Sequence, residues 1–345
     1  MPIVKVTTSY PAWPLARQTP GSVGRWGDWQ FIINQPINDC DAWVVLDDLR
    51  AVERCQCPAN RTMLINLEPP THSGYDPGFL APFAVVAACG GHGFAHPSVR
   101  EIFPPQPWYF GLDFSETRHN TLANRLSFWK YEQIAALEPS KTKDISVVCS
   151  NKNFTEGQRQ RLAFVQRLKA HFGERLDWFG VGVRPITDKA QAVLDYRYHV
   201  AIENGCFPHY WTEKLADPYL GWAMPVYCGC PNVTEYFDDR AMLRIDIAQP
   251  DEAIKRIEQA MAEDLWRHSL PALAEARRLV LERYNLFPFI IDLLTKLPPA
   301  TERQPITLRP NAHHVGRVRS ALRRLRAKMQ FGLGVTKLFP ALRKL

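Results

Sequence analysis

The stretch from residue 196 to 237 constrains the fold most, because its pattern is that of a complete strand–helix–strand unit. It begins with an aromatic and β-branched run, Tyr196 to Ile202, which is typical of a buried strand. A helix is predicted to start near Thr212, and a second strand, Pro225 to Tyr227, closes the unit. In parallel α/β sheets, ligands bind beyond the carboxyl ends of such strands, where helix N-termini point inward. We therefore predict a ligand site where the first of these strands ends.

Two charged residues follow Thr212 in the first turn of the predicted helix. Glu213 suits the positive end of a helix dipole, whereas Lys214 opposes it. A lysine in this place is favourable where it meets an anion. The stretch thus indicates an anionic ligand.

Short strands alternate with helical segments on both sides of a polar, proline-marked stretch at residues 138–144. In the first half, strands are expected at Ile3 to Thr7, Trp26 to Asn34, Ala42 to Leu46 and Arg61 to Leu67, with a helix-like run at residues 49–55. In the second half, strands are expected at Ile145 to Cys149, Leu176 to Phe179 and Leu243 to Asp246, and an amphipathic helix at Glu156 to Phe172. This alternation predicts an α/β protein with two Rossmann-like domains facing a cleft. We expect the domains to span residues 1–140 and 141–300, and a basic tail to occupy residues 301–345.

The net charge of +7 belongs to the end of the chain. From Arg317 onward there are nine lysines and arginines and no acid, which leaves residues 1–316 with 33 basic and 35 acidic groups. The body of the fold therefore has no basic surface of the kind that binds nucleic acid, and no nucleic-acid partner is expected.

The tail has the pattern of an amphipathic helix. Val318, Leu322, Leu325 and Met329 form one apolar seam, and arginines fill much of the remainder. Residues 317–345 would suit an anionic membrane surface. The alternative is a helix that packs on the body of the protein and leaves its basic face in solvent.

Several features favour a cytoplasmic protein. No apolar run approaches the ~20 residues that span a bilayer, and the first residues lack the apolar core of a secretory signal. The eight cysteines include no C-x-x-C pair, so packed, reduced thiols are expected. With the basic tail, the expected location is the cytoplasm, peripheral on the inner face of the cell membrane.

The spacing E-N-x7-T-E-K-x10-P-V-Y-x-G-x-P, which begins at Glu203, resembles the donor-binding signature of glycosyltransferase family 10, the α-1,3/4-fucosyltransferases. Upstream, LINLEPPTHS at residues 64–73 resembles the N-F-E-S-P-S-H segment of that family. VVCSNKN at residues 147–153 resembles its S-N strand end, and the helix carrying Arg161 resembles its arginine-bearing helix. The four blocks occur in the family's order and cover roughly residues 60–240.

This resemblance implies a GT-B fold and an inverting enzyme of the bacterial type. Such an enzyme transfers L-fucose from GDP-β-L-fucose to a glycan hydroxyl, with an α-1,3-type linkage, in the synthesis of cell-surface polysaccharide or lipopolysaccharide. It implies a nucleotide-sugar donor and a glycan acceptor as substrates, and no further cofactor. The alternatives are the same fold with a different nucleotide-sugar donor, and a non-catalytic nucleotide-sugar binding protein.

The resemblance also assigns site residues. Glu68, held by two prolines after a strand, stands at the position of the catalytic base, and an exposed loop carboxylate is the alternative. Arg161 and Lys214 are the candidate clamps for the departing diphosphate, although Arg161 also has neighbours that suggest a solvated helix face. The donor-binding set is Arg161, Asn204, Tyr210, Glu213 and Lys214. His72 either helps to bind the acceptor or holds its loop.

Two positions depart from the family pattern, and no metal site is evident. Ile202 stands where the family has Phe, and Trp211 where it has Val or Ile. The adjacent acids Asp47-Asp48 and Asp238-Asp239 are typical of turns, and no D-x-D motif lies at a predicted strand end. We therefore expect no metal ligands, with the cations replacing a metal at the diphosphate.

Overall fold

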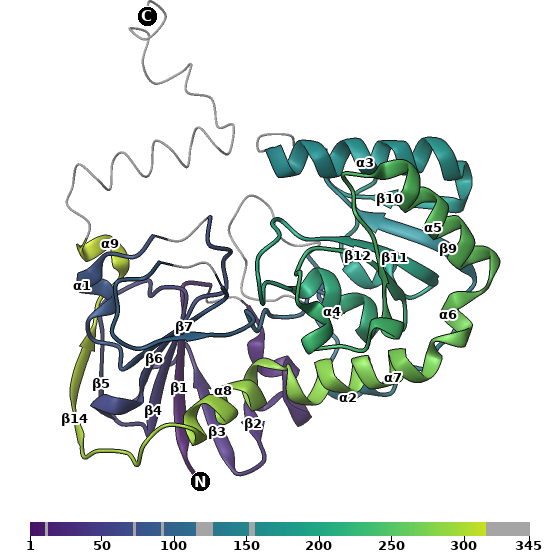
Figure 1. Cartoon of the computed structure of the whole chain (residues 1–345). Helices are drawn as coiled ribbons and strands as arrows, with labels where there is room; N and C mark the ends of the chain where they lie inside the picture. Colours follow the sequence, from purple (N-terminus) through teal and green to yellow (C-terminus); the bar gives the residue numbers. More distant parts are fainter. Residues whose placement is uncertain (11–12, 72–73, 91–92, 115–126, 152–155, 315–345) are drawn as a thin grey trace, which may run out of the picture.

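The computed structural model describes residues 1–10, 13–71, 74–90, 93–114, 127–151 and 156–314. Two sheets stand side by side, each with its own helices and its own core (Figure 1). The first sheet has the strand order β2-β3-β1-β4-β6-β7-β8, and the second has the order β10-β9-β11-β12-β13. All neighbours pair in parallel except β2 with β3, which are antiparallel. The predicted α/β fold with two Rossmann-like domains is confirmed.

The strands of the first sheet are rich in β-branched and other apolar residues and are largely buried at its centre. Their bounds are β1 Ile3–Thr8, β2 Arg25–Trp26, β3 Trp29–Ile33, β4 Ala42–Leu46, β6 Thr62–Ile65, β7 Val85–Ala88 and β8 Val99–Glu101. Side chains alternate between the two faces, because successive residues of a strand point in opposite directions. Val44 and Met63 lie in one core cluster, whereas Val45 and Leu64 lie in the other.

The second sheet is built from β9 Lys143–Val148, β10 Leu176–Phe179, β11 Tyr196–Ile202, β12 Met224–Cys228 and β13 Leu243–Arg244. Its helices are α3 Glu156–Phe172, α4 Glu213–Leu220, α5 Pro250–Ala262, α6 Leu265–His268 and α7 Leu270–Arg278. Helix α3 contacts β10 and α5, whereas α4 contacts β11, β12 and α7. A large apolar cluster joins these layers. The predicted helix at residues 156–172 and the predicted strands at residues 176–179 and 196–202 are confirmed.

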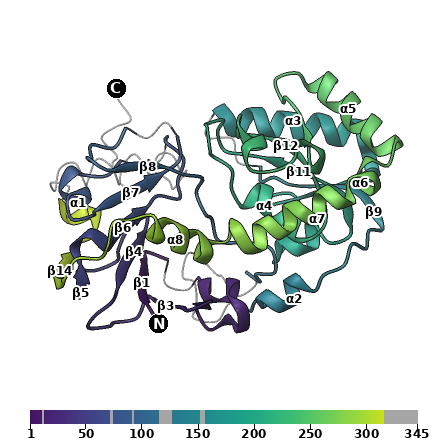
Figure 2. The ribbon, with the colours of Figure 1, turned by 60° about the horizontal axis from the view of Figure 1, so that its bottom comes forward.

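The end of the chain returns to the first sheet. A π-helical turn, Leu279–Arg283, leads from α7 into α8 Leu286–Thr295, and α8 buries Leu286, Phe287 and Ile290 against the first sheet (Figure 2). Strand β14 Arg303–Leu308 then pairs antiparallel with β5 Glu53–Pro58. The domain limits remain a prediction, and we propose to count residues 286–314 with the N-terminal domain.

Strand β5 corrects one prediction. The helix-like run at residues 49–55 overlaps β5, so the helix predicted there is wrong. Its strand conformation depends on hydrogen bonding to β14, which is remote in sequence. The remaining short helices are α1 Pro77–Leu80, α2 Tyr131–Ala135 and α9 Asn311–His314.

A buried arginine holds the segment that connects the two sheets. Arg17 lies in the 3-10 helix η1 Leu15–Gln18 and is only 1% exposed. Its guanidinium donates to the backbone carbonyls of Trp108, Phe110 and Gly111. The backbone on both sides of Tyr109 is thereby fixed, and Tyr109 faces the site described next.

Candidate functional site

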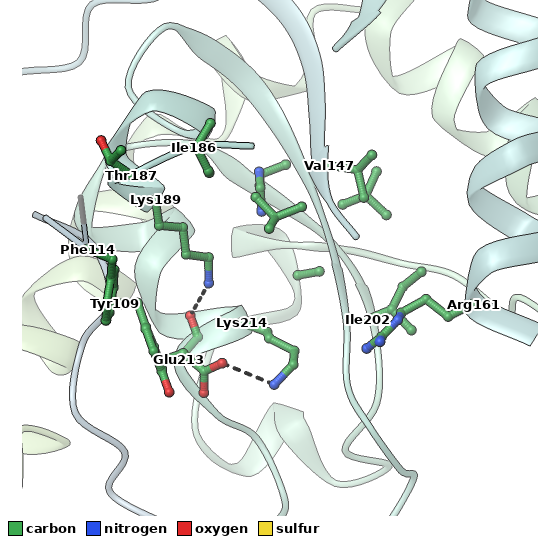
Figure 3. Close-up of a pocket in the computed structure, with 14 residues that line it drawn as sticks. Tyr109, Phe114, Val147, Arg161, Ile186, Thr187, Lys189, Ile202, Glu213 and Lys214 are labelled. Carbon is green, nitrogen blue, oxygen red and sulfur yellow. Dashed lines mark hydrogen bonds and ion pairs between the residues drawn. The ribbon is translucent and has the colours of Figure 1, made fainter. Parts of the chain in front are cut away.

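The carboxyl end of β11 opens onto a cavity of about 250 Å³ (Figure 3). The strands β9 and β11 form one wall, α3 contributes Arg161, and α4 contributes Glu213 and Lys214. Lys189 comes from the turn before β11, and Tyr109 comes from the segment that connects the domains. The cavity therefore lies where the strand order of a parallel sheet predicts a ligand site.

A buried carboxylate joins the end of β11 to the start of α4. Glu203 follows β11 directly, and its two oxygens accept hydrogen bonds from the backbone N–H and the hydroxyl of Thr212, each at 2.8 Å. Thr212 in turn caps the helix, because its hydroxyl accepts from Lys214 N at 3.3 Å. Burial raises the pKa of Glu203, and the cation of Lys214 opposes that shift. Glu203 therefore positions the first turn of α4.

Lys214 has two carboxylate partners within the protein. Its Nζ lies 3.1 Å from Glu213 Oε1 and 3.6 Å from Glu203 Oε2. Burial lowers the pKa of Lys214, but the attraction of Glu213 and Glu203 outweighs burial, and the pKa is raised. The anion that this lysine was predicted to need is thus partly supplied by the chain. A bound diphosphate would add to these contacts or displace one of them.

Arg161 lies at the opposite wall of the cavity from Glu213 in Figure 3. Its Nη1 donates to Asn204 Oδ1 at 2.9 Å, so two of the predicted donor-site residues are in contact. Its neighbours on α3 behave differently: Arg159 pairs with Glu156 on the exposed face, and Arg167 pairs with Asp251. The solvated-face alternative therefore describes those two arginines, whereas Arg161 faces the cavity.

Lys189 is a cavity residue that the sequence did not indicate. It begins the short 3-10 helix η5 Lys189–Ala192, and its Nζ donates to the Glu213 carbonyl at 3.0 Å. The same Nζ lies 2.9 Å from Asp217 Oδ2, and the Asp217 side chain is fully buried. Burial raises the pKa of Asp217 to about 6, although Lys189 opposes that shift. Lys189 and Asp217 are remote in sequence, and neither belongs to a recognisable motif.

A second cavity, of about 140 Å³, lies at the carboxyl ends of β4 and β6 in the first sheet. Glu68 lines it, together with Tyr10, Trp13, Asp47 and Tyr109. Tyr109 lines both cavities, so the two sites meet at this residue. The predicted base is thus placed beside the predicted donor site, on the other domain.

Tyr210 is buried and lines neither of these two cavities. It is 2% exposed, and burial raises its pKa, reinforced by the negative charges of Glu203, Glu213 and Glu68. The tyrosine is therefore within electrostatic reach of residues from both cavities. It is a positioned, neutral hydroxyl at neutral pH.

The two departures from the family pattern have different surroundings. Ile202 lines the first cavity, so the departure at this position changes the surface offered to a ligand. Trp211 stacks on Phe103 with ring centroids 4.5 Å apart and belongs to the core. Trp211 therefore serves packing between the two domains.

Some predictions fall on other parts of the chain. His72 and the tail at residues 317–345 lie outside the described residues. Within the described part of the chain, no group of three or more His, Cys, Asp or Glu side chains is arranged to hold a metal ion. In the same part, every helix is too short or too polar to cross a membrane.

Comparison with known proteins finds a family model that matches part of the second domain. Residues 138–264 match the family described as glycosyltransferase family 10 (fucosyltransferase) C-term. This span includes Arg161, Lys189, Glu203 and Lys214, whereas Glu68 lies before it. The match covers the residues that line the first cavity except Tyr109 and Phe114, and it includes none of the residues that line the second cavity.

Individual relatives are similar over part of their length. Human 4-galactosyl-N-acetylglucosaminide 3-alpha-L-fucosyltransferase FUT6 is 28% identical over 113 residues, 31% of this chain and 31% of that protein. Alpha-(1,3)-fucosyltransferase FucT of Helicobacter pylori is 30% identical over 73 residues, 21% of this chain and 15% of that protein. The chain therefore spans about a third, or less, of the length of these relatives. A crystal structure of alpha1,3-fucosyltransferase with GDP-fucose aligns with a TM-score of 0.47 and 14% identity, over 88% of this chain and 93% of that one.

Proposed function

We propose that this protein transfers L-fucose from GDP-β-L-fucose to a glycan hydroxyl, because residues 138–264 match the model of glycosyltransferase family 10, the fucosyltransferases. One observation supports this most strongly. Three cations, Arg161, Lys189 and Lys214, line one cavity at the end of β11, and a carboxylate, Glu68, lines the adjoining cavity. A group that takes a proton and cations that hold a departing diphosphate are the two requirements of this reaction.

In the proposed reaction, Glu68 takes the proton of the acceptor hydroxyl. The oxygen attacks the anomeric carbon as the bond from that carbon to the diphosphate breaks, so the configuration inverts to an α-linked product. GDP leaves with the bonding electrons, and the proton on Glu68 passes to solvent afterwards. Arg161 and Lys214 stabilise the charge that develops on the diphosphate. Arg161 offers a planar fork to the phosphate oxygens, whereas Lys214 supplies a point charge.

Glu213 and Asn204 are proposed to contact the donor. The Glu213 carboxylate is held by Lys214, and its carbonyl by Lys189, so its orientation is fixed before a ligand enters (Figure 3). Burial raises its pKa, but the cations of Lys214 and Lys189 dominate and lower it. An ionised carboxylate of this kind accepts hydrogen bonds from sugar hydroxyls. Asn204 orients Arg161, and Tyr210 is proposed to belong to the same donor site.

The setting of the reaction is also a proposal. The acceptor would be a precursor of a cell-surface polysaccharide or lipopolysaccharide, met at the inner face of the cell membrane. The basic sequence of residues 317–345 supports this location. A protein cut after residue 316 should then bind vesicles of anionic lipid less strongly than the full chain. Equal binding of both proteins would remove the membrane proposal.

A ligand panel and one variant test the function. GDP-fucose and GDP should raise the thermal midpoint of unfolding more than UDP-sugars do, because the ligand stabilises the folded state by mass action. Stabilisation by a UDP-sugar alone would overturn the donor assignment. Glu68→Gln should abolish most transfer and keep the GDP response. Glu235→Gln, which changes an exposed carboxylate, is the matched control. Transfer by Glu68→Gln at the unmodified rate would exclude Glu68 as the base.

A further inference from the structure

Asp47 directly follows the last residue of β4, and residues 66–68 directly follow the last residue of β6. The two strands are parallel neighbours, with Leu46 opposite Ile65. Asp47 donates its backbone N–H to the Ile65 carbonyl at 2.9 Å, so the two strand ends stay together beyond the last paired residues. Its φ of +60° lies in the left-handed region, which most side chains avoid and Asp tolerates better. The chain accepts this conformation at a cavity wall, where such strained positions concentrate.

The side chain of Asp47 holds the backbone immediately before Glu68. Its Oδ1 accepts a hydrogen bond from the backbone N–H of Leu67 at 2.7 Å. It also accepts a longer bond, 3.4 Å, from the side chain of Asn66. Asp47 is 9% exposed and lines the same cavity as Glu68. Both contacts restrict the short segment that carries the proposed base.

The charges around Asp47 are negative. Those that act on it come from Glu68, in the same cavity, and from Asp48, the next residue. The other titratable groups nearby are Tyr10 and Tyr75, whose own pKa values are raised by burial and further by Asp47. His314, on α9, interacts electrostatically with Asp48. Among the described residues, Asp47 forms no ion pair with a lysine, an arginine or a histidine.

We propose that Asp47 is a positioning residue for Glu68: it fixes the backbone of Leu67, and its charge favours the arrival of a proton on Glu68. The inference rests on the proposed function, in which Glu68 is the base. Like charges in one site oppose each other, so an ionised Asp47 makes protonation of its neighbour more favourable.

Asp47 changes its ionisation near neutral pH. Burial raises its pKa to about 7, the Leu67 N–H opposes this shift, and the charges of Glu68 and Asp48 add to it. The negative charge on Asp47 therefore grows as the pH rises through neutrality. In consequence, the driving force for proton transfer to Glu68 grows over the same range.

Asp47→Asn separates the two parts of the proposal. The amide oxygen of Asn can still accept the Leu67 N–H, while the charge is lost. We expect the GDP-induced rise in thermal midpoint and the donor KM to stay unchanged. The reason is that the substitution does not alter the first cavity, at the end of β11, where the donor is proposed to bind and which we call the donor cavity. We expect kcat to fall by about 3- to 10-fold at its high-pH plateau, and the acid limb of the kcat profile to move to lower pH. An unchanged plateau and acid limb would overturn the electrostatic part.

Two further variants complete the test. Asp47→Ala removes the acceptor as well, so it should lower kcat more than Asp47→Asn and also lower the thermal midpoint. Equal kcat values for the two variants would overturn the backbone part. Asp48→Asn is the matched control, because its carboxylate accepts from Leu49 and Asn311 rather than Leu67. It should move the kcat profile less than Asp47→Asn does, and an equal effect would assign the shift to the general field of the loop.

A readout without turnover distinguishes this inference from the proposed function. If the unmodified protein transfers sugar from none of the donors, the proposed function fails, and the pairing of Asp47 with Glu68 can still be measured. The thermal midpoint as a function of pH is compared for the unmodified protein, Asp47→Asn, Glu68→Gln and the double variant. Coupling predicts that Glu68→Gln moves the transition assigned to Asp47 to lower pH. Additive effects of the two substitutions at every pH would show independent carboxyls and overturn the inference. Glu68→Gln alone shows the same shift should Asp47→Asn fail to fold.

Discussion

The carboxylate of Glu203 accepts both the backbone N–H and the hydroxyl of Thr212, each at 2.8 Å. Its position between β11 and α4 means that one buried side chain sets the direction of the helix whose first turn carries Glu213 and Lys214. The charge is tolerated because Lys214 lies 3.6 Å away and both carboxylate oxygens have donors. Glu203 therefore controls the geometry of the donor cavity without lining it, through its contacts with the start of α4.

We expect Glu203→Ala to destabilise the fold and to weaken GDP binding. The substitution leaves the Thr212 N–H without its acceptor and Lys214 without one of two anionic partners, at a cost of about 2 to 4 kcal/mol in the free energy of unfolding. Glu203→Gln keeps one acceptor oxygen and should cost less. Urea unfolding and calorimetric titration with GDP measure the two effects. Glu235→Ala, at an exposed site, should change neither, and unaltered GDP affinity in Glu203→Ala would contradict the assigned role.

Lys214→Met tests whether the lysine binds the diphosphate as well as its two carboxylates. A partly buried cation stabilises an anionic ligand strongly, so loss of the Lys214 charge should raise the Kd for GDP by about 10- to 100-fold. The Kd for guanosine, which has no phosphate, should change much less. Lys296→Met removes an exposed lysine that pairs only with Asp292 in the described structure, and it is the matched control. Equal losses for GDP and guanosine would place Lys214 in a purely structural role.

Much of the second domain could be predicted because its signals are local. The apolar periodicity of residues 156–172, the β-branched run ending at Ile202 and the cap at Thr212 each depend on neighbours in sequence. Strand β5 could not be predicted in this way, since its partner β14 lies far along the chain and residues 49–55 alone favour a helix. The return of α8 to the first sheet is another long-range packing effect.

The candidate site shows the same division. The helix start at Thr212 indicates Glu213 and Lys214 as site residues, and the resemblance to the family's arginine-bearing helix indicates Arg161. All three side chains line one cavity. The ion pair between Lys214 and Glu203 forms because the Glu203 side chain, at the end of β11, lies against the first turn of α4. The position of Lys214 in the helix dipole does not predict this contact. The sequence predicts a turn at Asp47, and its left-handed φ agrees with that. Its inward side chain depends on the neighbouring strand, which the linear pattern does not specify.

His199 should make the protein less stable in mild acid. Burial and the nearby cations of Lys189 and Lys141 lower its pKa to about 3. In the unfolded chain the pKa returns to about 6.5, so the unfolded state binds the proton between these values, and stability is lost as pH falls below about 6.5. At pH 5 this loss is about 2 kcal/mol relative to pH 7.5.

Urea unfolding of His199→Asn at pH 7.5 and pH 5 measures that loss. The variant lacks the ionisable ring, so the difference in unfolding free energy between the two pH values should be smaller by about 2 kcal/mol than in the unmodified protein. Asp47 acts in the opposite sense, because its raised pKa adds stability at low pH. Its contribution is the same in the variant and in the unmodified protein, so it cancels in the comparison. His268→Asn, at an exposed position, is the control. An identical pH dependence in His199→Asn and the unmodified protein would contradict the buried neutral histidine.

Lys189 and Asp217 form a buried ion pair whose loss should destabilise the protein in a pH-dependent way. Lys189 Nζ lies 2.9 Å from Asp217 Oδ2, and the Asp217 side chain is fully buried. Lys189→Met leaves this carboxylate without its cation, so the free energy of unfolding should fall by about 3 to 5 kcal/mol at pH 8. The loss should be smaller at pH 5, because the pKa of Asp217 is already about 6 with the lysine present and rises further without it. Protonation then removes the unpaired charge.

A second substitution separates this structural effect from ligand binding. Asp217→Asn removes the buried charge, so the double variant should recover most of the stability lost in Lys189→Met. GDP affinity should stay reduced in the double variant, because Lys189 also lines the donor cavity and is one of its three cations. Lys255→Met, at an exposed position on α5, is the matched control and should be neutral in both measurements. Full recovery of GDP affinity together with stability would show that Lys189 acts on the ligand only through the fold of α4.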